Sequence, residues 1–287
     1  MIKFETFCSE RPFEVYKKAV DRKANAVVKT ELLNIETDME SCYDDYKNHH
    51  DNNNIEMISQ SSIGIAHKNS LLDLFGAKAK VIKDFRSEFF RINPSTYNNL
   101  CPYCAISEAN TTEHILPKER FPEYAIDVLN LIPVCSQCNG KKGEYIVDSH
   151  GNRFTINFYK DELPNVQFLY AVIMYNGTEL KVKYKLDNPE GAIDANVYSL
   201  ICRHYDRFNL LERYNDQAIA HLPEIKNNYL AERFNTAAAF DEFATKQLIK
   251  CQLDQPALGF NHWHIVLRMA AATSLDFKNY IMNHPLL

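Results

Sequence analysis

Long hydrophobic runs are missing from this sequence of 287 residues. A membrane-spanning helix needs about 20 predominantly apolar residues, and no stretch approaches that length, so the sequence predicts no membrane span. The N-terminus, Met1–Glu5, also lacks a basic segment followed by an apolar core. We therefore expect no secretory signal and a cytoplasmic protein.

An excess of positive charge is missing as well. Lysine and arginine total 32 against 37 aspartate and glutamate, which gives a formal net charge of −5. Because nonspecific binding to nucleic acid depends mainly on neutralising phosphates, strong unaided binding to DNA is not expected. A protein of this charge that acts on DNA needs a local basic face or a partner that delivers the substrate. The 46% hydrophobic and 24% charged content is otherwise that of an ordinary globular protein.

The cysteine pattern does not indicate a disulfide framework. Of eight cysteines, four form two C-x-x-C pairs and the others are isolated in the sequence, so metal binding in a reducing compartment is the simpler interpretation. We expect the isolated cysteines to be small apolar side chains at packing positions. These four are Cys8, Cys42, Cys202 and Cys251.

The two C-x-x-C pairs bracket the most informative stretch of the chain. They are Cys101-Pro-Tyr-Cys104 and Cys135-Ser-Gln-Cys138. Each pair places two thiolates on one side of a tight turn, and two such knuckles together supply the four ligands of a closed tetrahedral zinc site. The sequence therefore predicts a structural zinc ion.

Four polar residues between and beside the knuckles are not required by a zinc clip. They are Glu113, His114, Asn130 and Asn139. Hard oxygen ligands suit Mg²⁺ or Mn²⁺, and a neutral imidazole suits a general base near neutral pH. A second site, for chemistry, is the hypothesis that follows. Taken singly, Asn139 is also a candidate helix N-cap and Asn130 an ordinary turn residue.

This arrangement resembles the HNH endonuclease family. The resemblance covers residues 101–143 and consists of an acid–His pair, a following Asn-Leu and an Asn directly after the last knuckle cysteine. It implies a two-stranded hairpin and a helix around one catalytic divalent ion. In that family's pattern Glu113 and Asn139 would hold the ion, His114 would be the general base, and Asn130 would steady the loop and orient the histidine.

The same resemblance gives Lys142 as a contact to a substrate phosphate, and Lys118 is a further candidate for substrate binding. Arg120, Lys141 and Arg153 could extend these into a basic rim, but a solvated surface charge is an equally good interpretation of each of these residues. The chain departs from the family pattern in two ways. Glutamate rather than aspartate precedes the histidine, and the spacer before the Asn-Leu pair is long.

The periodicity of the remaining chain predicts helices and a β-hairpin. Together with the treble-clef-like ββα-metal module that the resemblance implies, they predict an α+β, mainly helical fold. We expect helix over 11–47 and from Ser70 to about Pro94, a strand over 153–159 and a hairpin over 166–186 that turns at Asn176-Gly177. Further helices are expected from Asp194, from about Asn209 to Leu253, and from Pro256 onward. The predicted regions are 1–95 (helical), 96–150 (nuclease module), 151–190 (strands and hairpin) and 191–287 (helical).

Several polar stretches outside the module favour a structural interpretation. The segment 48–54, with His49 and His50, resembles a solvated loop. The alternating lysines of the hairpin are interpreted as protection of a sheet edge, although they could touch phosphates. His262 and His264 flank the single tryptophan and point to different helix faces, which favours packing over a shared metal.

The main functional hypothesis is a metal-dependent HNH endonuclease that hydrolyses phosphodiester bonds in DNA. The negative net charge and the long regions on either side of the module favour an effector that a protein partner positions on its substrate. By analogy with other HNH proteins, we expect a role in anti-phage defence. The alternative is a catalytically silent zinc module that binds nucleic acid or a protein. The Glu113-His114 pair discriminates between them, because a pure zinc clip tolerates any residues at these positions.

Overall fold

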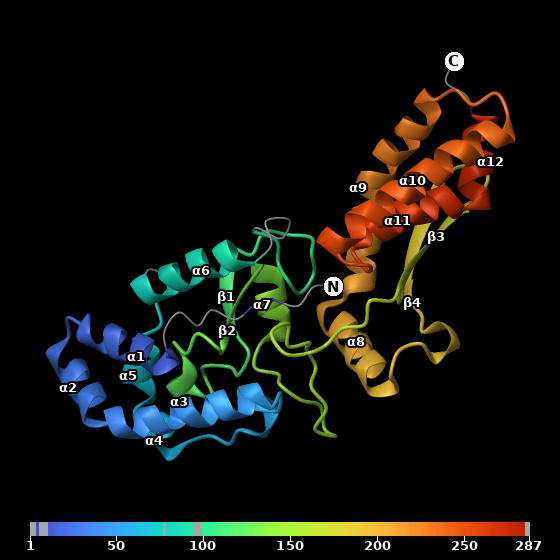
Figure 1. Ribbon diagram of the computed structural model, residues 1–287. Helices are drawn as coiled ribbons and strands as arrows, with labels where there is room; N and C mark the ends of the chain where they lie inside the picture. Colours follow the sequence, from blue (N-terminus) through green and yellow to red (C-terminus); the bar gives the residue numbers. More distant parts are fainter. Residues whose placement is uncertain (1–3, 6–10, 77–78, 94–98, 285–287) are drawn as a thin grey trace. The chain divides into compact units, whose positions relative to one another are not determined.

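The computed structural model describes residues 4–5, 11–76, 79–93 and 99–284. The chain divides into two compact units, one of Lys3–Glu162 and one that contains Leu163–Leu287. Figure 1 draws the first in blue to green and the second in yellow to red. Helices dominate both, and each described unit carries a two-stranded sheet, so the mainly helical α+β fold is confirmed. The division into four regions stays a prediction.

The first unit begins with three helices where the sequence predicts one helical stretch. Asn25 begins the second helix, because its side-chain oxygen accepts hydrogen bonds from the N–H groups of Val27 and Val28. Phe13, Tyr16, Val20 and Leu32 of the predicted apolar face are buried, whereas Val27 is 77% exposed. The bounds are α1 (Pro12–Asp21), α2 (Ala26–Asn34) and α3 (Glu36–Asp51).

The loop predicted over 48–54 is wrong for its first residues. Helix α3 continues to Asp51, and His50 is buried near the rings of Tyr46 and Tyr159 instead of being solvated. Aromatic neighbours from distant parts of the sequence bury this polar stretch, and its composition alone gives no sign of them.

The second predicted helix is interrupted. Ser70 does not cap a helix start but lies inside a short helix, and its hydroxyl donates to the carboxylate of Glu31 at 2.5 Å. The predicted apolar face is confirmed further on, where Phe85 and Phe89 are buried, and the predicted end at Pro94 lies outside the described residues. The bounds are η1 (Ile55–Met57), α4 (Ser62–Ala66), α5 (Lys68–Leu72) and α6 (Lys80–Ile92).

A small hairpin and one short helix form the centre of this unit, visible in green in Figure 1. Strands β1 (Thr111–His114) and β2 (Leu131–Val134) pair antiparallel, with Glu113 opposite Ile132 and His114 opposite Leu131. Helix α7 (Ser136–Lys142) follows β2 directly and packs on β1. It ends at Gly143, whose φ of 53° is a conformation that glycine adopts without steric cost. The predicted hairpin and helix are therefore both present.

The strand predicted over 153–159 is not formed. Ile156 and Phe158 are buried as the alternation suggested, but Tyr159, which has the opposite parity, is buried as well. The segment makes only an isolated bridge between Val147 and Arg153. No partner strand lies beside it in the described part of the chain. Alternating apolar residues here line an irregular core segment, because a strand also needs a hydrogen-bonded neighbour.

The second unit opens with the predicted hairpin, β3 (Leu169–Tyr175) and β4 (Leu180–Leu186). Its turn is longer than the predicted two residues, because Tyr175 pairs with Leu180 and four residues connect them. Asn176 organises this turn, since its side-chain oxygen accepts from the N–H groups of Thr178 and Glu179. The hairpin itself is confirmed and only its connection differs.

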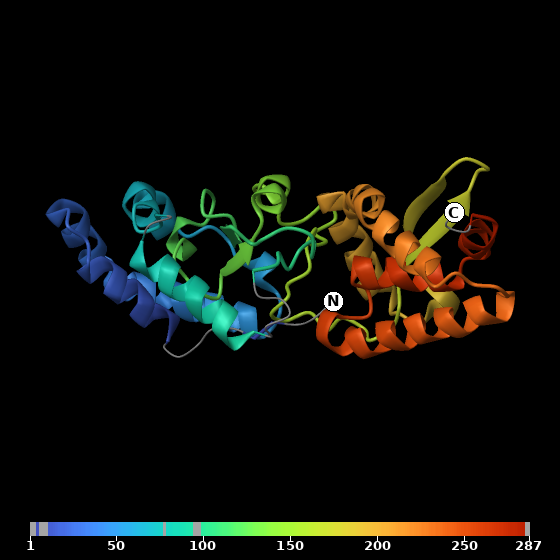
Figure 2. The ribbon, with the colours of Figure 1, turned by 90° about the horizontal axis from the view of Figure 1, so that it is seen from above.

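Helices follow the hairpin and pack on its strands, α9 on β4 and α11 and α12 on β3 (Figure 2). Asp194 begins the first of them, as predicted, by accepting from the N–H groups of Asn196 and Val197. A helix start predicted at Pro256 is wrong, because this proline lies inside α10. The bounds are η4 (Pro189–Gly191), α8 (Ala195–Phe208), α9 (Leu210–Ala231), α10 (Ala237–Leu258), α11 (Trp263–Thr273) and α12 (Leu275–Asn283).

The packing role predicted around the single tryptophan is confirmed. Trp263 is buried, and its ring lies near those of Tyr214, His221 and His264. Cys251 is also buried and Cys42 and Cys202 are partly buried, whereas Cys8 lies outside the described residues. Among the described residues, no helix has the length and hydropathy that crossing a membrane requires.

Candidate active site

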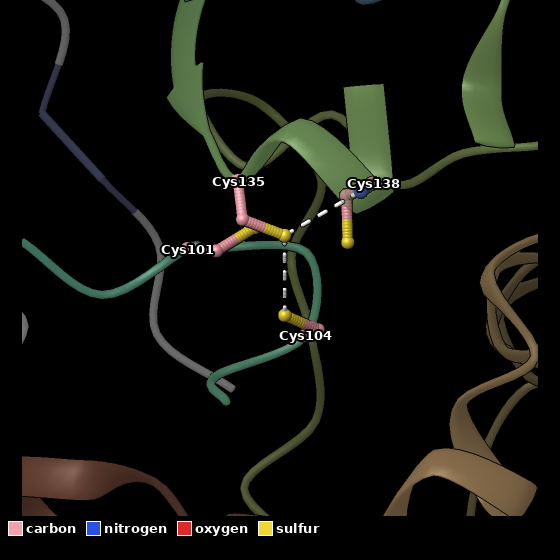
Figure 3. A group of neighbouring side chains, drawn as sticks. All are labelled: Cys101, Cys104, Cys135 and Cys138. Carbon is pink, nitrogen blue, oxygen red and sulfur yellow. Dashed lines mark hydrogen bonds between the residues drawn. The ribbon is translucent and has the colours of Figure 1, made fainter. Parts of the chain in front are cut away.

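Four cysteines converge at the start of the central module (Figure 3). Cys101 and Cys104 lie in the turn that precedes β1, Cys135 is the N-cap of α7, and Cys138 lies in its first turn. All four side chains are buried, and their sulfur atoms lie within 4.8 Å of one another. The two knuckles predicted from the sequence therefore do meet.

The geometry of this cluster fits a tetrahedral zinc ion. Zinc–sulfur bonds of about 2.3 Å at tetrahedral angles place sulfur atoms about 3.8 Å apart. The Sγ atoms of Cys104 and Cys135 are 3.9 Å apart. Four buried thiols this close also need a cation if they are to ionise together. The donor set and spacing thus match the structural zinc site that the sequence predicts.

Glu113 lies on the hairpin strand that faces α7, and it is not exposed to solvent. Its carboxylate forms an ion pair of 2.9 Å with the ammonium of Lys142, which is 1% exposed and also donates to the carbonyl of His114 at 2.7 Å. Burial raises the pKa of Glu113, and the nearby lysine opposes that shift. A helix residue thus fixes the acid against the strand.

This position of Lys142 differs from the substrate contact expected from the family pattern. A buried ammonium that is bound to Glu113 and to a carbonyl is not available to a phosphate in this structure. The lysine instead compensates the charge of a buried carboxylate.

His114 ends β1, and its imidazole is enclosed. The Nε2 atom lies 2.9 Å from the carbonyl oxygen of Ala125, and the ring of Phe75 packs edge-on at 4.4 Å. A carbonyl only accepts, so Nε2 carries the proton of the neutral ring and Nδ1 keeps the lone pair. Burial lowers the pKa of His114 to about 3, although the hydrogen bond to Ala125 opposes the shift. The imidazole is therefore neutral near pH 7.

Asn130 is fully buried and makes four hydrogen bonds. Its Oδ1 accepts from the N–H of Leu116 at 2.7 Å and from the hydroxyl of Tyr46 at 3.0 Å. Its Nδ2 donates to the carbonyl of Leu116 at 3.0 Å and to that of Tyr124 at 3.1 Å. These four bonds use all the hydrogen-bonding capacity of the Asn130 amide, and they join the end of β1 to the loop that contains Ala125. The residue holds the backbone around His114 in place.

Asn139 lies on α7 and faces β1. Its Nδ2 donates to the hydroxyl of Thr111 at 3.2 Å and to the carbonyl of Thr112 at 3.4 Å. The N-cap of this helix is Cys135, so the alternative interpretation of Asn139 as the cap does not hold. With its amide group donating to the strand, the carbonyl oxygen Oδ1 is the atom left to bind a cation.

The candidate residues lie on two sides of β1. Successive residues of a strand point to opposite faces. Glu113 shares the α7 face with Asn139 and Lys142, whereas His114 packs toward Phe75 on the other face. The structure therefore brings the acid and the amide to one helix–strand interface, and it places the imidazole at the adjacent strand end.

The expected basic rim is only partly at the surface. Lys118 lies over the ring of Phe75 at 6.0 Å and pairs with Glu119, which puts it near the enclosure of His114. Arg153 is mostly buried in an ion pair of 2.7 Å with Asp161, so its role is structural in this structure. Arg120 is exposed, and Lys141 is half-buried.

Three contributors to this site were not anticipated. Tyr46 reaches Asn130 from α3, Phe75 covers the imidazole, and the backbone of Ala125 sets its tautomer. Arg86 of α6 adds a further link by donating to the carbonyl of Thr111 at 2.5 Å. Tyr46, Phe75 and Arg86 lie outside the motif, and Ala125 acts through its main chain, so no spacing rule in the sequence reveals them.

A hairpin and a helix beside four clustered cysteines define the class of this site, a ββα module with a zinc-like cysteine cluster. Residues 101–144 match the family model described as HNH endonuclease. The matched residues are those that form the hairpin, the helix and the cysteine cluster.

Two curated relatives extend the similarity beyond that domain. Protein ea31 of Escherichia phage lambda is 26% identical over 189 residues, which are 62% of this chain and 62% of ea31. Septu protein PtuB of Bacillus thuringiensis is 31% identical over 97 residues, which are 29% of this chain and 38% of PtuB. The chain spans less than two thirds of the length of either relative. No solved structure matches the chain.

Proposed function

We propose that this protein is a metal-dependent endonuclease that hydrolyses phosphodiester bonds in DNA. The match of residues 101–144 to HNH endonucleases supports a nuclease. The assignment of phosphodiester hydrolysis depends on one observation, the orientation of His114. A purely structural zinc module has no need of a histidine that is held in one tautomer.

His114 is the proposed general base. Its Nε2–H is committed to the carbonyl of Ala125, so Nδ1 is the nitrogen that accepts a proton from water. Its lowered pKa keeps it unprotonated near neutral pH. Asn130 acts as a positioning residue, since it ties the strand end to the loop that supplies this carbonyl.

Glu113 and Asn139 are the proposed protein ligands of a catalytic Mg²⁺ or Mn²⁺. They offer a carboxylate and an amide oxygen at one helix–strand interface, a set of hard donors that suits these ions. The carboxylate of Glu113 already stabilises one cation in this structure, the ammonium of Lys142. When bound, the ion would supply positive charge for the phosphate and the leaving oxygen.

Substrate delivery is proposed to need a protein partner. The net charge of −5 opposes unaided attraction of DNA, and of the candidate basic residues Lys142 and Arg153 are occupied in buried ion pairs. We propose an effector role in anti-phage defence, and the similarity to Septu protein PtuB is the comparison on which this role rests.

A plasmid-nicking assay with Mg²⁺ or Mn²⁺ tests the proposal, first on the chain alone and then with candidate partners. Replacing His114 by Ala should lower the cleavage rate by about 10²–10⁴-fold, the usual contribution of a general base, at unchanged zinc content. Cleavage of the same length of RNA provides the comparison for substrate class. Equal cleavage of plasmid by wild type and H114A would overturn the assignment of the base.

The enclosed state of the site favours one second candidate, a catalytically silent zinc module. Glu113 is occupied by Lys142, and His114 is covered by Phe75. If neither wild type nor H114A cleaves any nucleic acid with either metal and with partners present, this second candidate replaces the first.

A further inference from the structure

The two outer edges of the β3–β4 hairpin differ in how they are covered. In an antiparallel pair, every second residue turns its N–H and C=O away from the neighbouring strand. On β3 three of these outward groups are closed by side chains of the C-terminal helices and the segment before them. Leu169 N–H donates to Asn261 at 2.9 Å, Tyr175 N–H donates to Asp276 at 3.0 Å, and the Ile173 carbonyl accepts from Ser274 at 3.2 Å.

The outer edge of β4 is closed at one residue. Tyr184 N–H donates to the side-chain oxygen of Asn215 on α9 at 2.8 Å, which shows that Tyr184 faces outward. Leu180 and Val182 have the same parity and therefore face outward as well. Within the described residues, no hydrogen bond reaches the outward N–H and C=O groups of these two residues. A short length of β4 thus remains able to pair with another strand.

This open length borders a groove. A cavity of about 610 Å³ lies between β4 and α9, with Tyr280 of α12 at its wall. Ala218, Ile219 and Leu222 line the α9 side, and Ile219 is 75% exposed. An apolar wall beside unpaired backbone groups is the arrangement by which sheet edges bind extended peptides.

The charges around the groove decide between possible occupants. Lys181, Lys183 and Lys185 are exposed along β4. Lys181, Lys226 and Glu179 line the groove, and Glu179 is already paired with Lys181 at 3.2 Å. Lys183 and Lys226 have no ion-pair partner among the described residues. A second copy of this chain would set its own lysine row beside this one, which is unfavourable. An acidic strand is complementary.

We propose that β4 accepts, at Leu180–Val182, an extended segment of a partner protein as a third strand. Its apolar side chains face Ile219 and Leu222, and its alternate, acidic side chains lie beside Lys183. Nucleic acid would use the lysines but not the backbone groups, so the free N–H and C=O groups favour a peptide. The surface lies within the unit of Leu163–Leu287 and does not depend on the nuclease chemistry.

The test uses the full chain and a fluorescein-labelled peptide, Glu-Val-Asp-Ile-Glu-Val-Asp, followed by fluorescence anisotropy. We expect saturable binding, lost when alternate peptide amides are N-methylated in the pattern that blocks pairing with β4. Ile219→Asp and Lys183→Glu should each weaken binding by about tenfold or more, as expected for central contacts of an interface. The matched control is Leu253→Asp on α10, because Leu253 is 73% exposed and lies outside the groove.

Two results would overturn the proposal. One is no saturable binding of the acidic peptide up to about 1 mM, the weak end of specific association. The other is binding that N-methylation in either pattern, or Ile219→Asp, leaves unchanged. A 20-base-pair DNA duplex serves as a competitor. If the duplex binds in a Lys183-dependent manner and the peptide does not bind, the face serves nucleic acid and the proposal is wrong.

Discussion

The ammonium of Lys142 lies 2.9 Å from the carboxylate of Glu113, in a region that solvent does not reach. A buried carboxylate with one compensating cation is stabilised by that cation, and removing the cation leaves an uncompensated charge. Any divalent ion that binds Glu113 therefore competes with an internal lysine. The proposed metal affinity is a balance between these two cations.

Replacing Lys142 by Met should increase the affinity of zinc-loaded protein for Mn²⁺, because Glu113 then lacks its internal cation. Without Mn²⁺ the free energy of unfolding should fall by about 3 kcal/mol, the cost of breaking a buried ion pair. Isothermal titration with MnCl₂ and thermal unfolding measure both effects. Lys141→Met, at a half-buried neighbour, is the control and should change neither. An unchanged Mn²⁺ affinity in K142M would show that Glu113 does not bind the ion.

Asp127 is a second buried acid, and it lies between His114 and Asn130 in the sequence. It is fully buried in the loop that contains Ala125; one carboxylate oxygen accepts from the N–H of Leu129, and the other has no partner among the described residues. Burial raises the pKa of Asp127 to about 7. The folded protein therefore keeps a proton that the unfolded chain loses near pH 4.

The sign of the pH effect follows from that difference. Between about pH 4 and pH 7 the native state binds more protons than the unfolded state at this residue, so its contribution to stability falls as pH rises. Asp127→Asn should therefore raise the free energy of unfolding by about 1–3 kcal/mol at pH 8 and change it little at pH 4. Urea unfolding at both pH values measures this. A larger gain at pH 4 than at pH 8 would contradict the raised pKa.

At the scale of elements, helix α3 supports the active-site loop through one phenol. Tyr46 donates to Asn130, whereas the hydroxyl of Tyr43, one turn earlier, has no hydrogen-bond partner in the described structure. Both rings are buried. These two residues provide a matched pair for testing whether this hydrogen bond matters.

Tyr46→Phe should lower the free energy of unfolding by about 1 kcal/mol, because it leaves Oδ1 of Asn130 with one donor fewer. Tyr43→Phe should be neutral or slightly stabilising, since it removes a hydroxyl that lacks a partner. If Asn130 orients His114 through the loop, Y46F should also lower kcat for cleavage with little change in KM. Equal behaviour of the two variants in both measurements would show that the Tyr46 contact has no special role.

The sequence predicts those parts of the structure that are determined by interactions between neighbouring residues, and it fails where distant residues determine the structure. The β3–β4 hairpin, the Asp194 cap and the two knuckles follow from neighbouring residues and are correct. The strand at 153–159 has the right alternation but no partner strand, which only the fold decides. At the site, residue types predicted the candidates, but the burial of Lys142 and the cover of Phe75 depend on long-range packing.

At the scale of the whole molecule, we expect the zinc cluster to stabilise the central module of the first unit and the second unit to fold independently of that cluster. The 30 residues between Cys104 and Cys135 include β1, β2 and Asn130, so one metal would fix both ends of this segment. A small hairpin and helix have too little core to remain folded unaided. No cluster of metal ligands is found in the described part of Leu163–Leu287.

Removing zinc with a chelator should therefore disorder the central module and leave the C-terminal unit folded. Hydrogen exchange followed by mass spectrometry should show loss of protection over β1, β2 and α7, with protection retained over α8–α12. Cys138→Ala should reproduce this pattern without chelator. Equal loss in both units, or none in the central module, would contradict the structural role of the cluster.

The most direct test of the central claim is the position of Mn²⁺ in crystals of the zinc-loaded protein, located by its anomalous scattering. The account predicts a manganese peak between the carboxylate of Glu113 and Oδ1 of Asn139, with the ammonium of Lys142 moved away. A manganese peak elsewhere, or none at these residues with Lys142 still bound to Glu113, would contradict a reaction centre at this site.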